Sequence, residues 1–206
     1  MINIINHGGV VMYPLFICSV IVLAAITERT FFWIIITINR DKNLAIEVLE
    51  LCRKGKLEKV QAKVKNSKDY IIKILISGIL HKDFSISKAM ESAASDEIKK
   101  MKRNMPVIDT MITVAPLLGI FGTVIGIILS FDAIGTTGIE HPKAVTAGIA
   151  QALLTTATGL GIAIFSVFPY NFFNSLIQNA SIEIEKTATN LEIVFEKLEE
   201  KSESKS

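Results

Sequence analysis

The chain has 206 residues, half of them hydrophobic, and a formal net charge of +2 at neutral pH. The hydrophobic residues are concentrated in long blocks that Lys, Arg, Asp and Glu do not enter. No basic run interleaved with aromatic residues occurs, so nucleic-acid binding is not expected. A helix that is apolar on all sides has no face for water, so these features exclude an ordinary soluble domain and favour a polytopic protein of the lipid bilayer.

The chain offers no recognisable catalytic or metal-binding arrangement. Its two cysteines, Cys18 and Cys52, are too few for a disulfide framework and are expected to be free thiols. Its three histidines are isolated and lack cysteines at zinc-ligand spacing. Because no nucleophile–base pair is evident either, we expect neither an enzyme nor a bound cofactor or metal.

The first apolar block, residues 10–38, follows a short N-terminal segment, residues 1–9. Its uncharged part is about long enough to cross the hydrocarbon of a bilayer. Glu28 and Arg29 come next, and since adjacent helical residues point about 100° apart, we expect that these two do not pair directly. Two interpretations stay open. The span ends near Arg29, so that Glu28 and Arg29 are a pair of interfacial charges with Arg29 reaching the headgroups, or a longer tilted helix turns Glu28 toward protein.

The polar middle of the chain, residues 39–106, carries sixteen of the twenty-two Lys and Arg residues. Its apolar residues recur at three- and four-residue spacing, and this pattern predicts a domain of helices with Gly55 as a natural stop. By the positive-inside rule, this domain is cytoplasmic. Three spans then place the N-terminus outside and the C-terminal tail inside.

The second span, residues 107–132, is rich in small residues. On a helical wheel, one stripe about 60° wide carries Gly119, Thr123, Gly126 and Ser130. Gly122 and Gly126 add a GxxxG spacing on the adjacent side, which permits close helix packing. Taken alone, the Thr123 hydroxyl is expected to bond back to the carbonyl four residues earlier.

A connection at residues 133–143 contains Gly135, Gly138 and Pro142, which are expected to break any helix there. Its shortness makes the second and third spans antiparallel neighbours. The third span and its extension, residues 144–182, would measure about 58 Å as one helix, against about 30 Å of hydrocarbon. It must tilt, project into water or break. The tail, residues 183–206, continues an apolar stripe that should pack on the cytoplasmic helices.

The third span has two different faces. The close-packing face carries Gly148, Ala152, Gly159 and Ala163, with Thr156 at its border. A separate polar stripe carries Gln151, Thr155 and Thr158. Polar side chains in a span face protein or water rather than lipid. This stripe therefore either forms hydrogen bonds between helices or lines a conduit. The residues alone leave both interpretations open.

Two motifs in these spans are specific: APLLGIFGTVIGIILSF at 115–131 and GIAQALLTTATGLGIAI at 148–164. They resemble the ExbB/TolQ family, relatives of the MotA stator proteins. GGVVMYP near the N-terminus, the Glu28–Arg29 pair and the PVIDT sequence at 106–110 support the resemblance. MotA-type stators have four spans, so three spans favour the ExbB/TolQ branch.

The resemblance implies an all-α membrane protein with three transmembrane helices that extend into a cytoplasmic helical domain. It implies a pentamer in the bacterial inner membrane around the single-span helices of an ExbD/TolR-like partner, with the N-terminus in the periplasm. Proton flow through such a complex energises a TonB-like protein for outer-membrane transport. A TolQ-like role in envelope maintenance is the alternative that the same resemblance offers.

The resemblance also assigns residues. Thr123 and Thr156 match the family's functional threonines, and with Gln151 and Thr155 they are expected to line the proton pathway or contact the partner helix. Gln151 departs from the family pattern, because well-known members carry glutamate there and glutamine cannot titrate. The titratable carboxylate would then come from an aspartate of the partner helix. A non-conducting scaffold for the partner helices is the other interpretation of this departure.

Overall fold

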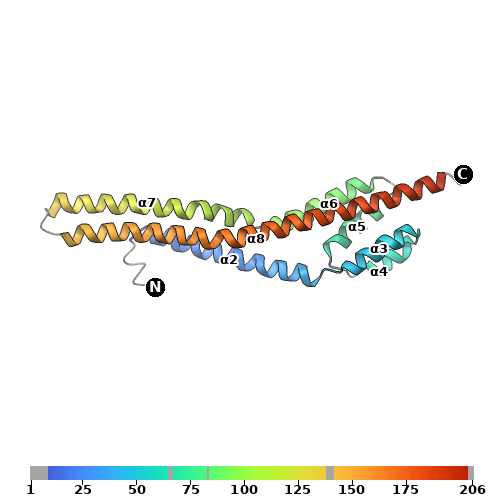
Figure 1. Ribbon diagram of the computed structural model, residues 1–206, viewed down its shortest axis with the longest axis horizontal. Helices are drawn as coiled ribbons and strands as arrows, with labels where there is room; N and C mark the ends of the chain where they lie inside the picture. The colour runs from blue at the N-terminus through green and yellow to red at the C-terminus, as the bar shows by residue number, and fades with distance from the viewer. Residues whose placement is uncertain (1–8, 65–66, 83, 138–141, 204–206) are drawn as a thin grey trace. The chain divides into compact units, whose positions relative to one another are not determined.

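The computed structural model describes residues 9–64, 67–82, 84–137 and 142–203 (Figure 1). The secondary structure of these residues is helical, and no strand occurs among them. The helices are α2 (Met12–Ile38), α3 (Lys42–Arg53), α4 (Leu57–Val64), α5 (Tyr70–Leu80), α6 (Ile86–Lys102), α7 (Met105–Thr137) and α8 (Pro142–Glu203). The prediction of an all-α protein is therefore confirmed.

Three helical stretches are long and apolar enough to cross a membrane: Met12–Ile38, Ile86–Asp132 and Thr146–Leu198. Large hydrophobic side chains point outward along them. Phe16 of α2 is 49% exposed, Ile128 of α7 is 60% exposed and Phe165 of α8 is 80% exposed. Exposed apolar surface of this extent indicates contact with lipid or with other transmembrane helices, which agrees with the predicted three-span membrane protein.

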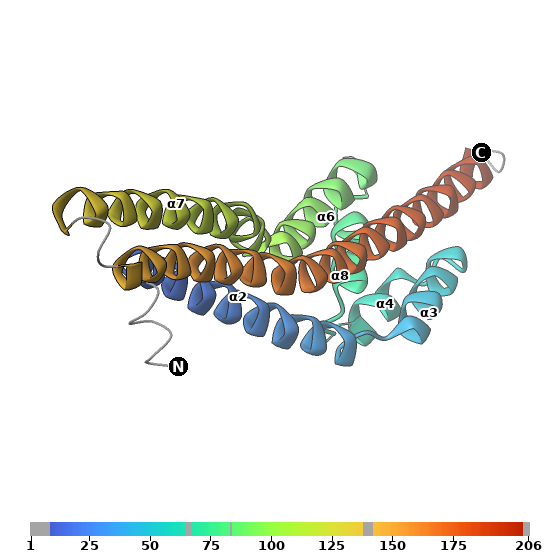
Figure 2. The ribbon, with the colours of Figure 1, turned by 60° about the vertical axis from the view of Figure 1, so that its left-hand side comes forward.

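The chain folds as two compact units, and the first comprises residues 1–29 and 104–173. In it, α7 and the first part of α8 run antiparallel and side by side (Figures 1 and 2). The buried core of this unit contains Val11, Met12, Leu15 and Ala115, against which Leu118, Ile125 and Ile162 pack. The first turns of α2 are thereby held against both α7 and α8.

One predicted helix break is absent. α7 continues through Gly135 to Thr137, so the expectation that Gly135 ends the helix was wrong. A glycine costs a helix only about 1 kcal/mol relative to alanine, which a long helix tolerates. Pro142 is the first residue of α8, a position that suits proline because a first-turn amide has no intrahelical partner. α8 also continues past Pro169 as one helix, whereas Gly138 lies outside the described residues.

The second unit comprises residues 30–103 and 174–206. α3 ends at Arg53, and Gly55 with φ +68° reverses the chain toward α4, which confirms the predicted stop. Asp69 caps α5 and Ser85 caps α6, each by accepting an amide hydrogen bond in the first turn. The predicted apolar stripe of the tail is buried in this unit through Ile184, Leu191, Val194 and Phe195.

Candidate functional site

The closest contact in the first unit is where α7 meets α8. We call this contact the glycine seam; it is formed by Gly119, Gly122 and Gly126 of α7 and Gly148, Ala152, Thr155, Thr156 and Gly159 of α8. A Cβ added at Gly126 would lie 2.8 Å from the Ala152 Cβ and 2.9 Å from the Gly148 carbonyl oxygen. One added at Gly119 would lie 3.0 Å from a backbone oxygen of α8. Only glycine permits this backbone approach at these positions.

Hydroxyl groups satisfy backbone carbonyls along the glycine seam. Thr156 Oγ1 donates across the helices to the Gly119 carbonyl oxygen at 2.9 Å. Thr155 is fully buried and donates within α8 to the Ala152 carbonyl oxygen at 2.8 Å. Ser130, also buried, donates to its own helix at 2.8 Å. These hydroxyls therefore act as packing and bonding groups of the helix pair.

Thr123 lies at the edge of the glycine seam and is only partly buried. Its Oγ1 donates to the Ile120 carbonyl oxygen at 2.5 Å, three residues earlier rather than the four expected. The Gly119 carbonyl, which was the expected partner, instead accepts the hydrogen bond from Thr156 of α8. With its proton used inside the helix, the Thr123 oxygen can still accept a hydrogen bond from another chain.

Gln151 lies away from this hydroxyl network, against the turn that begins α2. A Cβ added at Gly9 would lie 2.6 Å from the Gln151 Cδ, and Gly9 has φ +68°. The Gly9 carbonyl oxygen accepts the Met12 amide at 3.1 Å, which starts the helix. Gly9 was not predicted as a site residue, although the Gly8–Gly9 pair directly before the first apolar block is visible in the sequence.

Glu28 and Arg29 pair directly, so the expectation that they do not was wrong. Arg29 is 1% exposed, and its Nε and Nη2 each lie 2.5 Å from a carboxylate oxygen of Glu28. Neighbouring Cβ atoms diverge, but the long side chains reach each other because a buried guanidinium requires a carboxylate. Asn104 Nδ2 also donates to Glu28 at 3.0 Å, and Asn104 has φ 62° at the break between α6 and α7. Arg29 and Asn104 therefore both contact the Glu28 carboxylate, while the Glu28 side chain stays 43% exposed.

The second unit holds a buried polar cluster that sequence reasoning missed. Its centre is Arg40, whose side chain is 11% exposed and pairs with the fully buried Asp69 and with Glu183 of α8. Tyr70 donates its hydroxyl to Glu183 Oε2 at 3.0 Å, and the Arg40 guanidinium lies 5.2 Å from the centre of the Tyr70 ring. We call these four residues the Arg40 cluster.

Charge and burial set the titration of the Arg40 cluster. Burial alone would raise the pKa of Glu183, but the hydrogen bond and charge of Arg40 outweigh burial and lower it below the ordinary value of 4.5. Burial, and then the charge of Glu183, raise the pKa of Tyr70 above its ordinary value. At neutral pH Arg40 is therefore a cation, Glu183 a carboxylate and Tyr70 a neutral phenol.

The described residues contain no group of His, Cys, Asp or Glu side chains suited to hold a metal ion, and both cysteines are free and buried. The geometry instead consists of a tightly packed helix pair, a partly exposed hydroxyl beside it, and a buried ionic cluster in the second unit. An arrangement of this kind can bind another helix through close packing and hydrogen bonds.

Comparison with known proteins identifies the family. Residues 63–186 match the MotA/TolQ/ExbB proton channel family. The biopolymer transport protein named ExbB-like 3 of Synechocystis sp. is 32% identical over 206 residues, which covers 96% of each chain. TolQ of the Tol-Pal system of Pseudomonas aeruginosa is 39% identical over 90 residues, 44% of this chain and 39% of that protein. ExbB of Aquifex aeolicus is 43% identical over 74 residues, 36% of this chain and 50% of that protein. The chain therefore belongs to the MotA/TolQ/ExbB proton channel family, as its two span motifs predict.

Proposed function

We propose that this chain is a subunit of a motor or channel driven by the proton motive force in a bacterial inner membrane. Several copies, five by family resemblance, enclose the single-span helices of an ExbD/TolR-like partner and energise a TonB-like protein for outer-membrane transport. The N-terminus lies in the periplasm and the C-terminus in the cytoplasm. The family match and the relatives named as ExbB biopolymer transport proteins support this proposal.

The position of Thr123 carries the proposal. Of the four predicted pathway residues, Thr155 is fully buried, and Thr156 lies in the contact between α7 and α8, where its hydroxyl bonds across the two helices to the Gly119 carbonyl oxygen. Thr123 is partly exposed and keeps acceptor capacity on its oxygen. We assign Thr123 as a hydrogen-bonding contact for the partner helix. The two threonines of α8 stabilise the α7–α8 pair, from which the Thr123 side chain contacts the partner.

The chain does not supply the titrating group itself. Neither 110–131 nor 144–182 contains an Asp, Glu, Lys or Arg residue, and Gln151 cannot exchange a proton at neutral pH. Proton transfer at the midplane of the bilayer therefore needs a carboxylate from the partner, for which an aspartate on its single span is the natural source. Gln151 contributes hydrogen bonds and shape.

The test is proton flux in vesicles that contain the chain together with its single-span partner. Thr123→Ala should reduce flux by at least about tenfold if the hydroxyl orients the partner's carboxylate. Thr113→Ala is the matched control, because this exposed hydroxyl of α7 also bonds back to its own helix. Wild-type flux in the Thr123 variant would overturn the assigned role of this residue.

Two alternatives are separated by further measurements. Relatives named TolQ match 41% and 44% of the chain, which favours a role in envelope maintenance as the second candidate. Deletion of the gene would then cause leakage of periplasmic enzymes while uptake of large nutrients continues. A non-conducting scaffold, suggested by Gln151, predicts that activity survives a protonophore and that reconstituted vesicles show no flux.

A further inference from the structure

The second unit carries a groove between α6 and α8 with a cavity volume of about 310 Å³. We call it the acidic groove; its lining includes Glu91, Ala94 and Ile98 of α6 and Glu185, Ala188 and Glu192 of α8. No Lys or Arg lines it, and none of its three glutamates forms a salt bridge among the described residues. The groove therefore offers an apolar floor of small side chains between unneutralised carboxylates.

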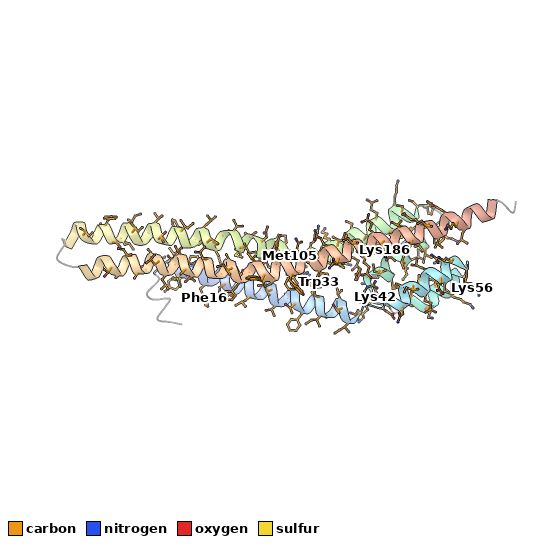
Figure 3. All side chains as sticks on the ribbon, viewed as in Figure 1. Phe16, Trp33, Lys42, Lys56, Met105 and Lys186 are labelled. Carbon is orange, nitrogen blue, oxygen red and sulfur yellow. The ribbon has the colours of Figure 1, made fainter. Side chains whose placement is uncertain are left out.

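The opposite charge is concentrated at the turn between α3 and α4. We call this segment the basic turn; it consists of Arg53, Lys54, Lys56 and Lys59, all exposed. Figure 3 labels Lys56 there. Gly55 with φ +68° lies at the centre of the turn, and no salt bridge among the described side chains joins any of the four cations to a carboxylate. Such a cluster attracts an acidic surface or an anionic lipid surface.

The burial pattern favours an acidic protein surface over lipid. A helix that inserts at a bilayer surface presents an apolar face to the acyl chains. Here the apolar residues of the two helices are turned inward, namely Ala45, Val48, Cys52, Val60 and Val64. Among the described side chains of α3 and α4, only Ile46 is a large exposed hydrophobic residue. The basic turn thus provides charge without the apolar anchor that lipid insertion requires.

The basic turn and the acidic groove lie on opposite sides of the second unit. α3 and α4 pack against α5, and α5 in turn packs against α6. In both ribbon views α6 lies on one side of the end of α8, and α3 and α4 lie on the other (Figures 1 and 2). The turn and the groove are therefore carried by different helices, and the groove that receives the turn is that of a second copy.

We propose that the basic turn of one copy docks on the acidic groove of the next copy. Such a contact joins two different surfaces of the same chain, and repeated around an axis it closes a ring. Complementary charge sets which surfaces meet and in what orientation. This inference rests on the proposed homo-oligomer and specifies the surfaces through which its copies contact one another.

The test is disulfide cross-linking in membranes that contain the full chain and its partner. Lys56→Cys and Glu185→Cys in one chain should give a ladder of cross-linked species, whereas co-expression of the two single variants should give dimers only. The native thiols do not interfere, because both are buried and burial raises the pKa of Cys52 to about 11. A two-fold symmetric contact would instead stop at the dimer even with both cysteines present.

Charge reversal tests the electrostatic basis. Here the cysteine pair is Lys56→Cys with Glu192→Cys, which leaves Glu185 available for charge reversal. Adding Lys54→Glu should lower the yield of this cross-link by about tenfold. Adding Glu91→Lys and Glu185→Lys as well should restore the yield. Lys88→Glu with Lys99→Glu, two exposed lysines of α6 outside both surfaces, is the matched control. Absence of a ladder while native mass spectrometry shows an intact oligomer would overturn this interface alone. A monomeric wild-type chain would overturn the proposed assembly as well.

Discussion

Arg40 and Glu183 are separated by 143 residues in the sequence, yet Arg40 Nη2 lies 2.6 Å from Glu183 Oε1. The same guanidinium pairs with Asp69, whose carboxylate also accepts the amides of Asp41 and Ile71, each at 2.8 Å. The loop after α2, the start of α5 and α8 are thus connected through one cation. Because Asp69 is fully buried, its charge depends on Arg40 for compensation.

Removal of the Arg40 cation should destabilise the second unit strongly. Arg40→Met leaves the Asp69 carboxylate buried and unpaired, and we expect a loss of about 3 kcal/mol in the free energy of unfolding. Thermal unfolding in detergent, followed by circular dichroism, measures this. The control is Arg103→Met, an exposed arginine outside the Arg40 cluster and the basic turn, whose replacement should change stability by less than about 0.5 kcal/mol. Equal effects of the two substitutions would contradict the role of the cluster.

The stabilising effect of Glu183 should depend on pH. Its pKa is lowered in the folded chain, so its contribution is present above the ordinary value of 4.5 and is lost as the pH falls through the folded-state pKa. We therefore expect a difference in melting temperature between wild type and Glu183→Gln at neutral pH that shrinks on acidification below 4.5. Glu50→Gln, at an exposed position of α3, should show no such convergence. A difference independent of pH would show that charge is not its source.

The glycine seam should tolerate no added methyl group. Gly126→Ala places a Cβ 2.8 Å from the Ala152 Cβ and 2.9 Å from a carbonyl oxygen, so the helices must separate, at a cost of about 1–3 kcal/mol. Gly161→Ala in α8 is the matched control, since no atom lies within 4 Å of its added Cβ. That control should be neutral or slightly stabilising, because alanine favours helix. The free energies of unfolding of the two variants, measured in the same detergent, test this prediction.

The energetic effect of the contact between Gly9 and Gln151 can be separated from backbone strain, because Gly55 has the same backbone conformation without such a contact. Both glycines have φ +68°, so alanine at either position costs about 1–2 kcal/mol in backbone strain. Gly9→Ala should cost more than Gly55→Ala, because only the Gly9 methyl group collides with a side chain. Replacing Gln151 by Ala should remove that excess. A double-mutant cycle of Gly9→Ala and Gln151→Ala measures this excess in the free energy of unfolding. Additive effects of the two substitutions would show that the contact contributes nothing to stability.

The sequence predicts best what depends on helical periodicity. The glycines of α7 and the small residues of α8 could be placed on facing stripes because the 3.6-residue repeat determines which residues share a face. The partner of Thr123 was predicted one residue off, because a threonine of another helix occupies the Gly119 carbonyl. Rules for an isolated helix do not include competition between hydroxyl groups of two helices for the same carbonyl oxygen.

The interactions that escaped prediction depend on long side chains and distant residues. The divergence of Cβ atoms excluded a Glu28–Arg29 pair, but two flexible side chains of that length can fold toward each other when one is buried. Arg40, Asp69 and Glu183 are scattered among ordinary-looking charges, and no spacing in the sequence marks them as a cluster. Only the tertiary fold shows which of the many surface-type charges become buried.

The glycine seam also has a mechanical consequence. Packed helices usually slide past one another by small rotamer changes at their interface. Where the contact is between backbone atoms, as at Gly119 and Gly159, there are no interfacial side chains at these glycines to reorient. No side-chain entropy is lost at these glycines when the contact forms, so the backbone approach there carries a smaller entropic cost than a contact between long side chains. In any working cycle of the complex, α7 and this part of α8 therefore move as a single rigid element.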